Sequence, residues 1–108
     1  MSPEIEISFG TLFKVKNYPD RTDVVINTGK DDYFEAARLH KTEDGKDTFF
    51  WSGTAGPENI EELAGKLTPE QVFEAYKNGA KRVGIELPEE FMQILIKYSQ
   101  KGPRKINY

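Results

Sequence analysis

Residues 5–16 read IEISFGTLFKVK, and this stretch decides the fold class. Every second residue from Ile5 to Val15 is apolar apart from Thr11, and Leu12 is the single apolar residue out of step. Because successive side chains of a β-strand point to opposite faces, this period of two predicts one long strand with one buried face. At Gly10 we expect a bulge, since a glycine inside a strand pattern often marks one.

The segments that follow predict further strands separated by turns. Residues 17–20 (NYPD) are typical of a turn, because proline fixes φ and the Asn and Asp side chains bond to nearby backbone groups. Residues 24–26 (VVI) are β-branched, which favours a short strand. Residues 42–46 (TEDGK) have Asp-Gly at their centre and predict a hairpin, with its strands at 38–40 and 48–51.

Residues 32–41 allow two interpretations. Asp32, with Glu35 three residues later, has the spacing of a capping box that opens a helix through Leu39. The hairpin signal at residues 42–46 instead requires a strand on its N-terminal side. We expect strand–turn–strand here, with a helix as the alternative.

After Trp51 the pattern changes from strands to helices. The loop at residues 52–56 (SGTAG) precedes Pro57, a residue that favours the first position of a helix. We therefore expect a helix at 58–64, which Gly65 ends.

Two further helices have clear start signals. Residues 68–71 (TPEQ) combine a hydroxyl N-cap, a proline at the first position and a glutamine at the third, and the helix is expected to end at residues 78–79 or soon after. Residues 87–90 (LPEE) begin the last helix, which is expected to end near Gln100, before Gly-Pro at 102–103.

The predicted fold is therefore α+β: an antiparallel sheet of about four strands in the N-terminal half, packed by two or three C-terminal helices. A length of 108 residues suits one domain, with a β-rich part at 1–53, a helical part at 57–101 and a basic tail at 102–108. The chain has no cysteine and an acidic start without an apolar segment, which favours a cytoplasmic protein. The apolar helical run at 91–96 is far shorter than the roughly 20 residues that span a membrane, so we expect no membrane contact.

The residue types exclude most catalytic and metal chemistry. His40 is the only histidine, and a nucleophilic serine or threonine usually needs such a base. We expect His40 at the surface or at the rim of a site. Zinc normally takes three or four ligands, mostly Cys and His, which this chain does not offer. We therefore expect no enzyme, no catalytic residue, no metal site and no cofactor.

Aromatic residues are the most informative feature for function. Eight of the thirteen fall between Phe9 and Trp51. Phe49, Phe50 and Trp51 are consecutive, so in a strand they cannot all face the same side. Either one large ring points away from the core, or it lies beneath the helical half.

The last helix has more apolar residues than one buried face needs. Phe91, Leu95 and Tyr98 form one stripe, with Ile94 beside it, and Met92 and Ile96 form a second ridge. The second ridge either packs against the neighbouring helix or contacts a partner. We interpret it as an association surface.

These features predict a non-enzymatic binding module that acts through protein–protein contact, as a small regulator or inhibitor or as a homodimer. Trp and Tyr are enriched at the hot spots of such interfaces. The predicted contact residues are Phe49, Phe50, Trp51, Met92 and Ile96.

The alternative is a single-stranded nucleic-acid-binding protein, in which exposed sheet aromatics stack bases beside basic residues. The formal charge of −3 opposes general nucleic-acid coating, although the segment after Glu90 carries only basic charges. The basic residues of this alternative are Lys14, Lys16, Arg38, Lys41, Lys101, Arg104 and Lys105.

Overall fold

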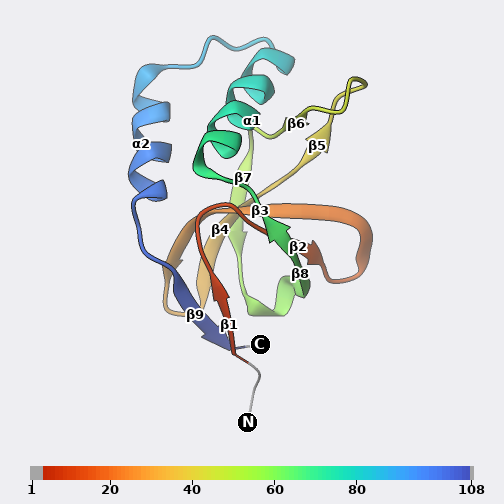
Figure 1. Cartoon of the computed structure of the whole chain (residues 1–108), viewed down its shortest axis with the longest axis vertical. Coiled ribbons are helices and arrows are strands. Elements are labelled where there is room, and N and C mark those ends of the chain that lie inside the picture. Colours follow the sequence, from red (N-terminus) through yellow and green to blue (C-terminus); the bar gives the residue numbers. More distant parts are fainter. Residues whose placement is uncertain (1–3, 108) are drawn as a thin grey trace.

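A computed structural model describes residues 4–107 of the chain, and its fold is α+β, as predicted (Figure 1). The main sheet is antiparallel and has five strands rather than four. In spatial order these are β7 (Ser52–Ala55), β4 (Tyr33–Arg38), β3 (Tyr18–Lys30), β2 (Thr11–Val15) and β8 (Ile60–Lys66). Two helices, α1 (Pro69–Arg82) and α2 (Glu89–Ser99), pack against this sheet.

Two small sheets complete the fold. β1 (Glu4–Ile7) pairs with β9 (Arg104–Asn107), and β5 (His40–Lys41) pairs with β6 (Asp47–Thr48). The β1–β9 pair lies at the end of the molecule opposite the two helices (Figure 1). The C-terminal segment is therefore not the basic tail that the charge pattern predicted, because within 104–107 it forms a strand whose Ile106 is buried in the core.

The single strand expected at residues 5–16 is divided into β1 and β2 at Gly10. Gly10 has φ +94°, and a Cβ there would overlap with the carbonyl oxygen of Leu67. The backbone turns at this glycine, so that β2 joins the main sheet while β1 pairs with β9. The expected bulge is thus a complete break, since only glycine fits this φ and this close approach.

The helix expected at residues 58–64 is wrong. A single 3₁₀ turn, η1 (Pro57–Asn59), is followed directly by β8. The Asn59 side chain accepts a hydrogen bond from the Gly56 N–H at 2.8 Å, which closes the turn after one round. Ile60 then inserts into the core opposite Val15 of β2. Pairing with a distant strand has overridden the local helix signal.

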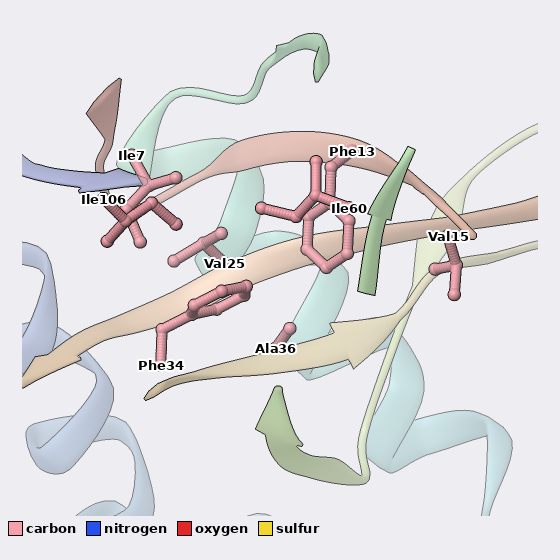
Figure 2. Close-up of a cluster of buried hydrophobic side chains, with 8 residues drawn as sticks. All are labelled: Ile7, Phe13, Val15, Val25, Phe34, Ala36, Ile60 and Ile106. Atoms are coloured by element: carbon pink, nitrogen blue, oxygen red, sulfur yellow. The ribbon is translucent and has the colours of Figure 1, made fainter. Parts of the chain in front are cut away.

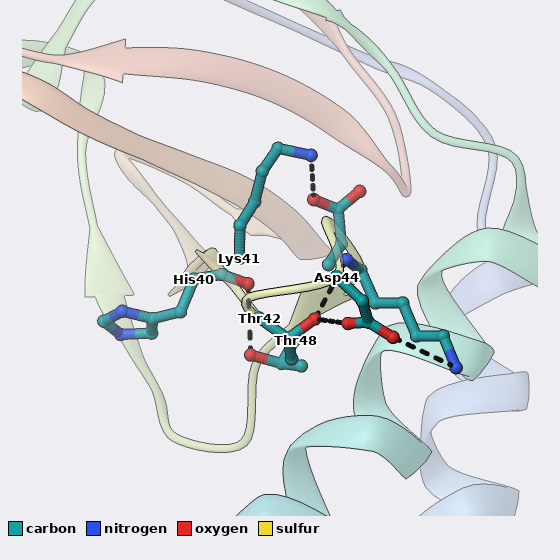
Figure 3. Close-up of polar contacts among 7 residues, drawn as sticks. His40, Lys41, Thr42, Asp44 and Thr48 are labelled. Atoms are coloured by element: carbon teal, nitrogen blue, oxygen red, sulfur yellow. Dashed lines mark hydrogen bonds and ion pairs between the residues drawn. The ribbon is translucent and has the colours of Figure 1, made fainter.

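The helix starts at residues 68–71 and 87–90 and the turn at residues 42–46 are confirmed, although the strands of the hairpin are the shorter β5 and β6. Thr68 and Gln71 form the predicted capping box at the start of α1. Residues 33–38 are a strand, which decides between the two interpretations of that segment, and the turn after Thr42 closes the β5–β6 hairpin (Figure 3). α1 extends to Arg82, a few residues beyond the end expected at residues 78–79 or soon after. A Cβ at Gly79 would overlap with the backbone of Phe49, so this glycine serves a close contact rather than a helix end.

One predicted turn and one predicted strand differ in extent from the structure. The turn expected at residues 17–20 comprises Lys16 and Asn17 alone, with Asn17 at φ 70°. The strand expected at residues 24–26 is the 13-residue β3, because it pairs with β2 along one part and with β4 along another.

The main sheet has a hydrophobic cluster on each face. Consecutive residues of β3 alternate between the two clusters, as strand geometry requires. The first cluster is drawn in Figure 2, with Ile7 and Ile106 of the β1–β9 pair at one end. It consists of Ile7, Phe13, Val15, Val25, Phe34, Ala36, Ile60 and Ile106. The second lies beneath the helices and consists of Phe9, Val24, Ile26, Ala37, Phe49, Val72, Ala75 and Leu95.

Candidate functional site

The aromatic linker, residues 49–51, connects β6 to β7 and lies outside any regular strand, contrary to the strand expected at 48–51. Phe49 is only 2% exposed and packs into the core beneath the helices. Phe50 is half-buried, whereas Trp51 is 74% exposed, the highest value among the large hydrophobic side chains of residues 4–107. Only one of the three rings therefore points away from the core.

The linker is held firmly against α1. The Phe49 N–H donates to the Ala75 carbonyl oxygen at 3.2 Å, at the surface where Gly79 permits the close approach. The Phe50 ring stacks on Tyr76, with 5.5 Å between centroids, and meets Trp51 edge to face at 5.0 Å. The exposed indole of Trp51 is therefore attached to a linker whose other two aromatic residues are packed against α1.

A cavity of about 500 Å³ opens beside Trp51. All four residues of β7 line it, and Phe13, Val15 and Ala36 of the neighbouring strands contribute apolar lining. The cavity also contacts Asn59, the residue before β8. β7 and β8 are the two edges of the main sheet, and within residues 4–107 the cavity is lined by every residue of β7 and by none of β8.

Three arginines and one histidine from different elements line the cavity. Arg21 binds Asp23 through two hydrogen bonds of 2.9 and 3.1 Å, and Asp23 is buried. Arg82 donates to the Thr48 hydroxyl at 3.1 Å. Arg38 and Arg82 are both exposed and form no ion pair within residues 4–107. The cavity therefore carries more positive than negative charge.

The pKa of the His40 imidazole responds to this local positive charge. Partial burial is the largest cause that lowers the pKa of its imidazole, and the positive charges of Arg82, Arg38 and Arg21 lower it further, against a smaller opposing effect of Asp23. The Thr48 hydroxyl donates to the His40 carbonyl oxygen at 3.1 Å, while the imidazole points away from the hairpin turn (Figure 3). The lowered pKa favours the neutral imidazole, so the arginines supply the positive charge of the cavity.

A smaller hollow of about 260 Å³ lies on the other side of the linker. Phe50 lines both hollows, and Tyr76 and Glu35 contribute to the smaller one. Burial raises the pKa of the Tyr76 hydroxyl. The exposed rim of this groove comes from α2, where Phe91 is 42% and Ile94 is 48% exposed.

The predicted ridge on α2 occupies a different place from the groove. Met92 and Ile96 are half-buried and line neither hollow, and Leu95 is the buried residue of this helix. Phe91 and Ile94 are the functional candidates that the sequence prediction did not select. From the sequence we placed Phe91 and Ile94 in or beside the apolar stripe of this helix. The sequence could not tell which of these side chains stay exposed, because that depends on where the sheet lies.

The basic residues of the nucleic-acid alternative are dispersed, and most are bound within the fold. Of the seven, Arg38 alone lines the cavity with the aromatic linker, and Lys16 is exposed in the turn before β3. The other five contact the protein itself: Lys14 with Thr22, Lys41 with Asp47, Lys101 with Asn27, Arg104 with the Thr28 and Tyr33 carbonyl oxygens, and Lys105 with Glu4. The sequence prediction did not select Arg21, Asp23 or Arg82. Arg21 and Asp23 are two residues apart but form no recognisable motif, and Arg82 is distant from both along the chain.

Residues 4–107 contain no sign of a metal site or of a membrane-spanning helix. No group of three His, Asp or Glu side chains there is placed to hold a metal ion. In the same part of the chain, no helix combines the length and apolar character that crossing a membrane requires. The chain matches no protein-family model, and comparison with curated proteins and with solved structures gave no match either.

Proposed function

We propose that this chain is a non-enzymatic binding module that contacts a protein partner through the aromatic linker and the hollows on its two sides. One observation carries the proposal: Trp51 is largely exposed although its neighbour Phe49 is buried. Tryptophan is enriched at interface hot spots, where its ring is desolvated by the partner.

The packing of Phe49 and Phe50 against α1 supports a binding role for the aromatic linker. Ordering a contact loop costs free energy when a partner binds, and a loop that is already ordered avoids this cost. The Phe49–Ala75 hydrogen bond and the Phe50–Tyr76 stack hold the linker before any partner arrives. Trp51 is therefore presented as a preorganised anchor.

The surroundings of His40 also favour binding over catalysis. A histidine that acts as a base is usually oriented by a hydrogen bond to one ring nitrogen and faces a nucleophile. Within residues 4–107 the hydrogen bond that involves His40 outside strand pairing is made by its backbone carbonyl oxygen.

The test uses a display library of random peptides, selected on the intact protein and measured on two variants. Peptides that bind should lose affinity by about 30-fold with Trp51→Ala, the size of a typical hot-spot effect. Tyr33→Ala is the matched control, since this exposed aromatic residue lines neither hollow. If no selected peptide depends on Trp51, the proposed function is wrong.

Single-stranded nucleic acid is the second candidate, because the exposed Tyr18 and Trp51 rings line the same cavity as Arg38. Oligothymidine binding that requires Trp51 and weakens steeply with salt would favour it. Three basic residues of this alternative lie at 101–105, but a truncation of residues 101–108 cannot test them, because it also deletes β9 and the core residue Ile106. Arg38→Gln is the appropriate variant.

A further inference from the structure

The outer edge of β7 is open. Within residues 4–107, β7 pairs only with β4, and no other backbone hydrogen bond involves its four residues. Their side chains are small and uncharged, Ser-Gly-Thr-Ala, so another backbone can come close. Unpaired N–H and C=O groups along such an edge can pair with an extended peptide from another protein.

The cavity runs along this open edge. All four β7 residues line it, and Trp51 immediately precedes the strand. An extended segment that paired with β7 would therefore lie beside the cavity, and its alternate side chains would share the face on which the cavity opens. Trp51 would cover one end of that segment.

The charges of the cavity define which segment fits. Arg21 is already neutralised by Asp23, which leaves the charges of Arg38 and Arg82 without an ion-pair partner in the described chain. The whole chain has a formal charge of −3, so this positive site contrasts with the rest of the molecule. A guanidinium group binds carboxylates through two parallel hydrogen bonds, and a partly enclosed site weakens such pairs less than bulk water does.

From these observations we infer that the partner contributes an acidic, extended segment, which pairs with the edge of β7 and places its carboxylates on Arg38 and Arg82. The inference rests on the protein-contact function proposed above, and it specifies the partner's chemistry. Trp51 supplies apolar contact beside the two charged anchors.

A nucleic-acid backbone fits this site less well. Phosphates follow one another along a strand and require a continuous basic track. Outside the cavity, lysines such as Lys41 and Lys105 pair with acids of this same chain. The open β-strand edge also recognises a peptide main chain, which nucleic acid lacks.

The peptide library tests this inference directly. Peptides selected on the wild type should be enriched in Asp and Glu at alternate positions. Arg38→Gln combined with Arg82→Gln should weaken them by at least about tenfold, as expected for charge-assisted hydrogen bonds. Lys16→Gln with Lys66→Gln is the matched control, because it removes the same charge from exposed residues outside both hollows and should leave the affinity unchanged.

Two further readouts use residues that occur once in the chain. Trp51 is the only tryptophan, so its fluorescence follows binding at the cavity. His40 is the only histidine, and a carboxylate bound beside it should raise the pKa that an NMR titration measures. A peptide with N-methyl groups on the alternate amides that face β7 should lose binding, because those amides can no longer donate to the strand, whereas methylation of the other set should be tolerated.

The outcomes separate the inference from the function. Peptides without acidic enrichment that require Trp51 but tolerate loss of both arginines would overturn the inference and leave the function standing. Acidic peptides that tolerate N-methylation of both sets of alternate amides, each set tested separately, would overturn the pairing with β7. If no peptide requires Trp51, both the inference and the proposed function fail.

Discussion

The two edges of the main sheet, β7 and β8, differ in length, charge and surroundings. β8 has seven residues, of which only Ile60 is buried, and it carries Glu61, Glu62 and Lys66. Charged side chains on an exposed edge oppose pairing with other strands. β7 has four small, uncharged residues and forms one wall of the positive cavity.

This difference indicates that the sheet protects one edge and leaves the other available. The exposed acids of β8 would repel an acidic strand, whereas the arginines near β7 would attract it. The shortness of β7 limits unspecific pairing, so the adjacent Trp51 and the cavity can decide which strand is accepted. The following predictions test this comparison.

The largest expected effect concerns the attachment of β8 to the core. Ile60→Ala should lower the free energy of unfolding by about 2–5 kcal/mol, because it leaves a void in the first core cluster beside Phe13. Urea unfolding measures the change. Leu63→Ala in the same strand is the control and should change stability by less than about 0.5 kcal/mol, since Leu63 is exposed. Equal effects would show that β8 is not held by Ile60.

The second prediction concerns the contact between α1 and the aromatic linker that leads into β7. Replacing a glycine inside a helix by alanine normally stabilises by about 1 kcal/mol. Gly79→Ala should instead destabilise by about 1–3 kcal/mol, because the added methyl group overlaps with the Phe49 backbone. Gly102→Ala is the control, since a Cβ there meets open space. A stabilising Gly79→Ala in urea unfolding would contradict the tight contact.

The third prediction exchanges the charge character of the two edges. Thr54→Glu gives β7 an acid like those of β8 and should weaken acidic library peptides by about tenfold, through repulsion and competition for the arginines. Glu62→Thr on β8 should leave their affinity unchanged, because Glu62 lines neither hollow. Fluorescence titration of Trp51 measures both. Equal losses in the two variants would show that the edges do not differ in the way proposed.

The sequence predicted most of the elements whose signals are local, except at residues 58–64, where pairing with β2 overrode the local helix signal. The capping box at Thr68, the Asp-Gly turn of the β5–β6 hairpin and the α+β class all follow from neighbouring residues. β8 and β9 were missed because their partners, β2 and β1, are distant along the chain. A strand that exists only through such pairing has no strong pattern of its own.

The candidate site was predictable only in part, for the same reason. The three consecutive aromatics at 49–51 left open whether one ring points away from the core or lies beneath the helices. The exposure of Trp51 depends on Gly79, which lets Phe49 pack beneath α1. The cavity depends on Arg21, Arg38 and Arg82, which come from β3, β4 and α1. No spacing in the sequence indicates that these three meet.

The smallest expected effect is the pH dependence that His40 contributes on the β7 side of the sheet. Its pKa is lowered in the folded protein, by partial burial first and then by Arg82, Arg38 and Arg21. The unfolded chain therefore binds more protons than the folded chain as pH falls toward and below the ordinary histidine value of about 6.5, so His40 destabilises the fold at low pH. Thermal unfolding should show that His40→Gln loses less stability than the wild type between about pH 7 and 5.

In protein that keeps His40, the double variant Arg38→Gln and Arg82→Gln should move the pKa of His40, measured by NMR, upward toward its ordinary value, because two of the charges that lower it are gone. Lys16→Gln with Lys66→Gln removes the same charge without facing His40 and should leave that pKa in place. An unchanged pKa in the double arginine variant would show that the cavity does not hold the positive charge that distinguishes the β7 edge from the β8 edge.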